Sequence, residues 1–178
     1  MATSEKERGD YTALITGRVF DDEENIRRLY IDKNVINKRL TLPDLIDLIK
    51  NINNTADCKE NILFVVENVG FQNSVVQILE REKIPVKGFH PGTQDKRTRL
   101  TLVSNLIKTG SVLFNEIDNE NLISQITGFG KERHDDMVDA LVMVIAEANE
   151  RYRLGHKHIT IPIIKSPMIT AGLKDKNF

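Results

Sequence analysis

The sequence RHDDMVDAL, residues 133–141, places three carboxylates directly before an apolar helical repeat. Asp136 and Asp139 are three residues apart, and Asp135 and Asp139 are four apart, so each pair shares one face of a helix. Like charges at this spacing repel, and a divalent cation between them would remove the repulsion, because hard cations bind carboxylate oxygens. The apolar residues that follow have the spacing of a helix with one buried stripe: Val138, Leu141, Val142, Ile145 and Ala148.

The same aspartates also fit a purely structural role. Aspartate is favoured at the N-cap and in the first turn of a helix, where it satisfies free N–H groups and the helix dipole. Asp139 lies beyond a plain capping position and has apolar neighbours on both sides, so we expect it to be partly buried and to need a partner. Capping and metal binding both remain open on these residues, and Asp139 favours the metal.

Length and composition indicate one soluble globular domain. The 178 residues are 40% apolar and 29% charged, and the net charge of −1 means that any basic surface must be local. The single cysteine, Cys58, excludes a disulfide framework and a cysteine-based zinc site, which fits a reducing compartment. We expect no signal peptide and no membrane span, and the absence of a Walker A loop excludes an NTPase made by this chain alone.

A second acidic position follows a continuous apolar run. Residues 62–66, ILFVV, predict a central strand buried on both faces, and Glu67 comes directly after it. Open α/β sheets place their sites at the carboxyl ends of such strands. Glu67 is therefore a candidate site residue, although a lone glutamate equally marks a strand that runs out into solvent.

The remaining patterns predict an α/β protein with a mixed sheet flanked by helices. Two strands over residues 11–20 and 26–35 read as an antiparallel hairpin, and Thr41 with Asp44 forms a capping box for the next helix. Residues from about 155 onward are basic and irregular, which predicts an extended tail. The further elements are helices over 72–83 and 119–127, a helix that starts within 90–99 and is stopped by Gly110, and strands over 85–89 and 112–114.

Several segments resemble the nuclease domain of the large terminase subunit of tailed bacteriophages. They occur in that family's order: ILFVVENVGFQ at 62–72, DKRTR at 95–99, LIKTGSVLF at 106–114 and HDDMVDAL at 134–141. Residues 4–14 resemble the family's first motif region, and the likeness covers roughly residues 2–150. HDDMVDAL alone is also similar to the last motif of Holliday-junction resolvases of the ribonuclease H-like fold.

The resemblance implies a ribonuclease H-like domain over residues 1–154 and an extended tail over 155–178. It also implies a metal-dependent endonuclease that cuts double-stranded DNA concatemers during genome packaging. Two Mg²⁺ or Mn²⁺ ions would act, one on the attacking water and the other on the leaving 3′ oxygen. The implied partners are double-stranded DNA, an ATPase domain in the full-length protein, the small terminase subunit and the portal. The resemblance implies no membrane partner. The implied location is the cytoplasm of the bacterial host, with the protein encoded by a phage or prophage.

The resemblance also assigns roles to individual residues. The catalytic and metal-binding acids would be Glu67, Asp135, Asp136 and Asp139, with Asp10 as a secondary metal ligand. Lys96, Arg97 and Arg99 would lie along DNA, although a cluster of this kind is more often a solvated helix face. His134 reads as an orienting or capping residue, with a general base as the alternative.

One departure from the family pattern concerns the first catalytic aspartate. The family carries it at the end of its first strand, in the pattern Asp-any residue-Ala ahead of Ser-Glu-Lys. Ala2 fills the alanine position and Met1 the middle one, so the aspartate would precede Met1. We therefore expect the family's first strand to be missing, and this polypeptide alone to be weakly active or inactive.

Two rival functions remain. A resolvase-like nuclease would share the acids but bind branched DNA, whereas a non-catalytic packaging or DNA-binding module would retain the fold without cleavage. The missing first aspartate favours the second rival. A small-molecule α/β enzyme has little support, because the sequence offers no glycine-rich phosphate loop and no nucleophile paired with a base.

Overall fold

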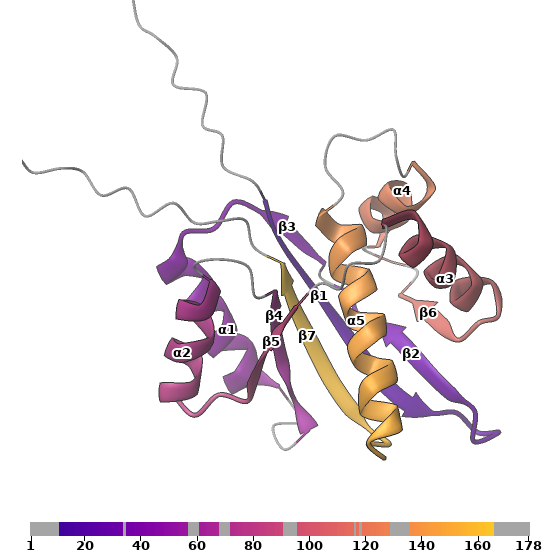
Figure 1. Ribbon diagram of the computed structural model, residues 1–178, viewed down its shortest axis with the longest axis horizontal. Helices are drawn as coiled ribbons and strands as arrows, with labels where there is room; N and C mark the ends of the chain where they lie inside the picture. The colour runs from indigo at the N-terminus through magenta and orange to yellow at the C-terminus, as the bar shows by residue number, and fades with distance from the viewer. Residues whose placement is uncertain are drawn as a thin grey trace, which may run out of the picture.

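The computed structural model describes residues 11–33, 35–56, 61–67, 72–90, 96–115, 117, 119–128 and 136–165. Within this part of the chain, one mixed sheet of seven strands forms the centre of the molecule (Figure 1). The strands are β1 (Thr12–Asp21), β2 (Arg27–Ile31), β3 (Ile36–Lys38), β4 (Phe64–Glu67), β5 (Val86–Phe89), β6 (Val112–Phe114) and β7 (Ile159–Lys165). The helices are α1 (Leu42–Thr55), α2 (Gln72–Arg81), α3 (Lys96–Lys108), α4 (Glu120–Thr127) and α5 (Asp136–Arg153).

The sheet has the order β5-β4-β7-β1-β2-β6, with β3 paired to the first part of β1. β4 runs parallel to both β5 and β7, and β1 runs antiparallel to β7, β2 and β3. The predicted hairpin is confirmed for β1 and β2. The predicted second strand is two strands, because the chain breaks pairing after Ile31 and returns as β3 to the other end of β1.

Strand residues alternate between two apolar layers. On one face, Ile15, Val65 and Ile163 pack with α5, and α3 and α4 complete this layer. On the other face, Leu14, Phe64, Val66 and Ile164 pack with α1 and α2. Figure 1 shows the two groups of helices on opposite sides of the sheet. Phe64, Val65 and Val66 have no exposed surface, which confirms the predicted buried central strand.

Gly17 allows α5 to lie close to the sheet. A Cβ atom at this position of β1 would be 2.5 Å from Val144 Cγ1 and 2.9 Å from Leu29 Cδ1. Contacts that short do not occur between real side chains, so any larger residue would push the helix away from β1. The glycine therefore helps to fix the position of the helix that carries the acidic motif.

The prediction of an extended tail from residue 155 was wrong for residues 159–165. These residues form β7, which lies between β4 and β1 in the middle of the sheet. Ile161, Ile163 and Ile164 are completely buried, so this strand contributes to both apolar layers. Residues 166–178 of the predicted tail lie outside the described residues.

The predicted capping box of α1 is confirmed. Thr41 Oγ1 accepts a hydrogen bond from the Asp44 N–H, and the Asp44 carboxylate accepts from the Thr41 hydroxyl and, at 3.3 Å, from the Thr41 N–H. The hydrogen bonds from the Thr41 side chain and backbone lower the pKa of Asp44 below its ordinary value of 3.8.

This shift makes the stability of the domain depend on pH. Because the folded-state pKa of Asp44 is depressed, its stabilising contribution is present above 3.8 and is lost as the pH falls through the lower folded-state value. We expect Asp44→Asn to lower the melting temperature at pH 7 and to lower it less as the pH approaches 3. Thermal unfolding of both proteins across this range measures the difference, and a pH-independent difference would contradict the assignment.

Candidate functional site

The acidic motif begins α5. Asp136 is the first residue of this helix, and Asp139 lies one turn later on the same side. Their side chains are each 16% exposed. Met137, Val138, Ala140 and Leu141 are buried between and behind them, so apolar packing holds both aspartates at the end of the sheet.

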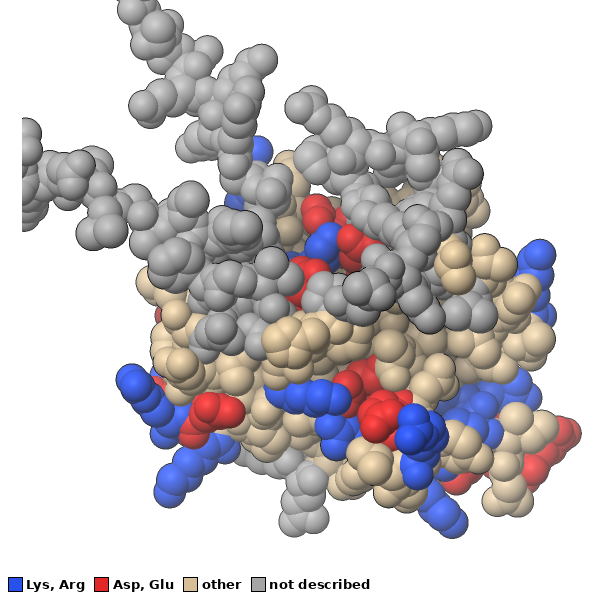
Figure 2. Space-filling model, in the orientation of Figure 1, with Lys and Arg blue, Asp and Glu red and all other residues tan. Residues whose placement is uncertain are grey.

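A lysine from β7 bridges the two aspartates. Lys165 Nζ donates to Asp136 Oδ1 at 3.0 Å and to Asp139 Oδ2 at 2.6 Å. Burial alone would lower the pKa of Lys165, but hydrogen bonds and charge interactions with Asp139 and Asp136 outweigh it, so the pKa is raised above its ordinary value of 10.5. Lys165 is therefore a positive charge at neutral pH. Figure 2 shows acidic and basic side chains next to one another where α5 begins and β7 ends.

Glu67 lies in the row next to Lys165. β4 and β7 are parallel, with Val65 opposite Ile163 and Val66 opposite Ile164, so the register places Glu67 opposite Lys165. Because Val65 and Ile163 both face α5, the alternation of strand side chains turns Glu67 and Lys165 to that face as well. The register therefore places the end of β4 next to Lys165, and Lys165 in turn contacts the start of α5.

The pair of aspartates offers two oxygen ligands of the kind that a divalent cation binds. One atom, Lys165 Nζ, is within hydrogen-bonding distance of an oxygen from each aspartate, so a positive charge is already accommodated between them. Carboxylate oxygens are the ligands that Mg²⁺ and Mn²⁺ prefer. Among the described residues, however, no group of three or more His, Cys, Asp or Glu side chains could hold a metal ion. Of the predicted acids, the described residues are Asp136, Asp139 and Glu67, and Lys165 donates to both aspartates.

For the other predicted site residues, the structure describes either the backbone alone or neither backbone nor side chain. Asp10, His134 and Asp135 lie outside the described residues. Lys96, Arg97 and Arg99 belong to the first turn of α3, but their side chains are not described. α3 packs beside α5 on the same face of the sheet (Figure 1), so the basic segment begins a helix in the same layer as the acidic one.

Sequence reasoning missed two polar residues on this face, Lys165 and Asn37. Lys165 follows an apolar, β-branched run that signals a strand, but Pro162 within the run argues against a central strand. Asn37 of β3 pairs with Ala13, which also pairs with Lys165 on its other side. Asn37 Oδ1 is buried without a hydrogen-bond partner, so this face carries a second buried polar group that local sequence does not reveal.

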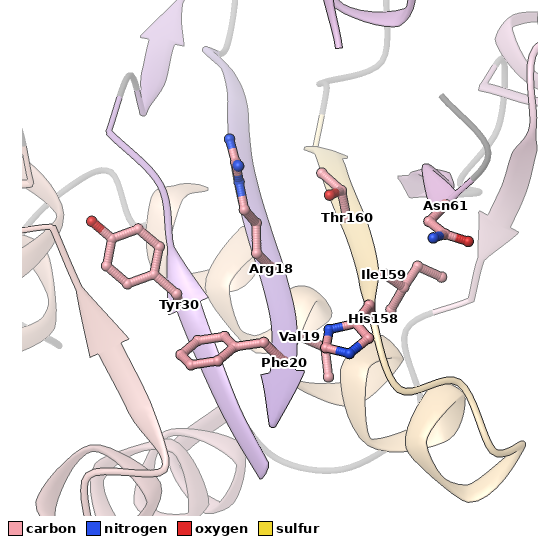
Figure 3. Close-up of a pocket in the computed structure, with 8 residues that line it drawn as sticks. All are labelled: Arg18, Val19, Phe20, Tyr30, Asn61, His158, Ile159 and Thr160. Carbon is pink, nitrogen blue, oxygen red and sulfur yellow. The ribbon is translucent and has the colours of Figure 1, made fainter. Parts of the chain in front are cut away.

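A hollow of about 420 Å³ lies at the opposite end of the sheet, mainly on the face away from α5. Figure 3 shows the residues that line it: Arg18, Val19, Phe20, Tyr30, Asn61, His158, Ile159 and Thr160. Arg18 is held by Asp32 at 2.7 Å. No carboxylate belongs to this lining, so the hollow has no group suited to metal-dependent hydrolysis, and the acidic end of the sheet is the better candidate site.

A comparison with models of known protein families identifies the family of this chain. A family model described as the terminase RNase H-like domain matches residues 2–148, which is most of the chain. The chain belongs to this terminase family. The match confirms the predicted family and the ribonuclease H-like mixed sheet, and it supports a nuclease-type role in a terminase in general. The family match ends before β7, so Lys165 comes from a segment beyond the matched residues.

The other two comparisons give no match, either among curated proteins or among solved structures. In the part of the terminase domain that the structure describes, none of the helices has the length and apolar character needed to cross a bilayer.

Proposed function

We propose that this terminase domain is a metal-dependent endodeoxyribonuclease that cuts double-stranded DNA concatemers during phage genome packaging. The observation that carries the proposal is that one cationic atom lies between the two aspartates. Lys165 Nζ is 3.0 Å from Asp136 Oδ1 and 2.6 Å from Asp139 Oδ2. Two carboxylates on successive helical turns, beside a strand that ends in Glu67, are suited to binding Mg²⁺ or Mn²⁺.

Each acid has a distinct place in the proposed chemistry. Asp136 and Asp139 are fixed by the buried residues of α5, so their oxygens require little reorganisation to bind a cation. Glu67 approaches from β4, which brings a carboxylate from a second element to the same end of the sheet. When bound, divalent ions would supply Lewis acidity for phosphodiester hydrolysis, as the two-ion mechanism of the resemblance implies. The protein's contribution is a fixed set of oxygen ligands.

The DNA path in this proposal follows the start of α3. Lys96, Arg97 and Arg99 lie in its first turn, and this sequence of cations is suited to contact with DNA phosphates. Since α3 and α5 share one layer of helices, DNA bound there would lie on the same side of the sheet as the acids. In a complete packaging machine, an ATPase domain, the small terminase subunit and the portal would be the protein partners.

A plasmid assay tests the function. Supercoiled plasmid is incubated with the chain and Mn²⁺, Mg²⁺ or EDTA, and we expect conversion to nicked and linear DNA with Mn²⁺ and none with EDTA. Cleavage that persists in EDTA, or no cleavage at any enzyme concentration with either metal, would overturn the proposal for this chain.

A non-catalytic packaging module is the second candidate, and one observation favours it. Lys165 already balances part of the charge of Asp136 and Asp139, so the domain holds these acids together without any metal. Isothermal titration calorimetry separates the candidates. A non-catalytic module would bind neither Mg²⁺ nor Mn²⁺ measurably, and Glu67→Ala would leave the titration unchanged.

A further inference from the structure

Lys165 and a divalent ion would require the same two oxygens. Mg²⁺ binds carboxylate oxygens at about 2.0–2.1 Å, and Lys165 Nζ occupies the position between Asp136 Oδ1 and Asp139 Oδ2 at 3.0 and 2.6 Å. An ammonium and a metal ion cannot both fill that space. The Lys165 side chain is only 17% exposed, so it is packed in this position and does not extend freely into solvent.

We propose that Lys165 is an internal competitor for the metal site of this domain. In the metal-free protein its ammonium holds Asp136 and Asp139 together, and a divalent ion binds only when the ammonium withdraws. This inference rests on the proposed function, because it concerns the same acids. The apparent metal affinity is then reduced by the fraction of time during which Lys165 occupies the carboxylates.

The charges around Lys165 support competition over simple structural pairing. Asp136 and Asp139 approach from α5 and Glu67 lies opposite on β4, while the β1 neighbour is the apolar Ala13. The two aspartates, Glu67 and Lys165 together carry a formal charge of −2, and a divalent ion would change it to 0. The displaced ammonium would then lie next to a cation, where a DNA phosphate is its natural partner. Lys165 thereby favours metal loading together with DNA.

The test is the Mn²⁺ affinity of full-length variants, measured by isothermal titration calorimetry. We expect Lys165→Met to bind Mn²⁺ roughly 5- to 150-fold more tightly than wild type, the usual range for the coupling of two binding events. Lys165→Arg keeps the charge and should bind like wild type. Lys87→Met is the matched control, because it also removes a strand lysine paired with an α5 carboxylate, Glu147, far from the acidic motif.

Thermal unfolding gives a second readout that does not depend on activity. Without metal, Lys165→Met should melt below wild type because two carboxylates lose their partner, and Mn²⁺ should raise its melting temperature more than that of wild type. Adding Asp136→Asn should abolish this gain. Equal or weaker Mn²⁺ binding by Lys165→Met, with wild-type binding that depends on Asp139, would overturn the competition and leave the proposed function intact. No binding by any folded variant would overturn both.

Discussion

Asp139→Asn should lower the rate of Mn²⁺-dependent plasmid cleavage by roughly a thousandfold or more, the scale of loss when one member of a catalytic unit is removed. The amide has nearly the same shape as the carboxylate, so α5 keeps its packing. The substitution removes the negative charge of the group that accepts the 2.6 Å hydrogen bond from Lys165. A cation between Asp136 and the amide would meet one anionic ligand where it now meets two.

Asp47→Asn is the matched control for this experiment. Asp47 is an exposed aspartate on α1, on the other side of the sheet, so the same chemical change there should leave cleavage within twofold of wild type. Initial rates of supercoiled plasmid loss at one Mn²⁺ concentration compare the three proteins. Cleavage by Asp139→Asn at the rate of Asp47→Asn would place the reaction elsewhere on the molecule.

The sequence predicts those elements of the fold that local patterns determine. Residues 62–66 read as a buried strand because each of them is apolar, and Phe64, Val65 and Val66 of β4 are all buried, as that run predicts. The start of α5 is predictable because the apolar repeat begins directly after the aspartates. Parallel strands end at the same edge, so a glutamate after one strand and an acidic helix start could be expected to meet.

The sequence does not reveal which strands become neighbours. β7 lies between β4 and β1, and its pairing joins residues almost 100 positions from Val65 and about 150 from Ala13. Pro162 and the basic residues before Ile159 favour a tail over a strand when only local patterns are considered. Lys165 could not be assigned to the acids for this reason: its contact with Asp136 depends entirely on that long-range pairing.

Removing both cationic partners of Glu147 should destabilise the domain by about 3–5 kcal/mol, the usual cost of leaving a buried charge unpaired. Glu147 lies in the second half of α5 and its side chain is 2% exposed. Lys87 of β5 donates to Glu147 Oε2 at 2.8 Å, and Arg151 donates to Oε1 at 2.7 Å. The double variant Lys87→Met/Arg151→Met retains the buried carboxylate without either donor.

The triple variant, which adds Glu147→Met, separates burial of a charge from loss of packing. Apolar residues of similar volume often replace a buried ion pair with little loss, so the triple variant should regain most of the stability that the double variant loses. Urea unfolding of wild type, double and triple variants gives the three free energies. A triple variant as unstable as the double would mean that the ion group contributes through attraction, and not by satisfying a charge that burial has made costly. With this group, α5 is tied to the sheet by a strand lysine in each half: at Lys165 one cation joins two acids, and at Glu147 one acid joins two cations. Only the first arrangement leaves two carboxylates whose lysine a metal ion can replace.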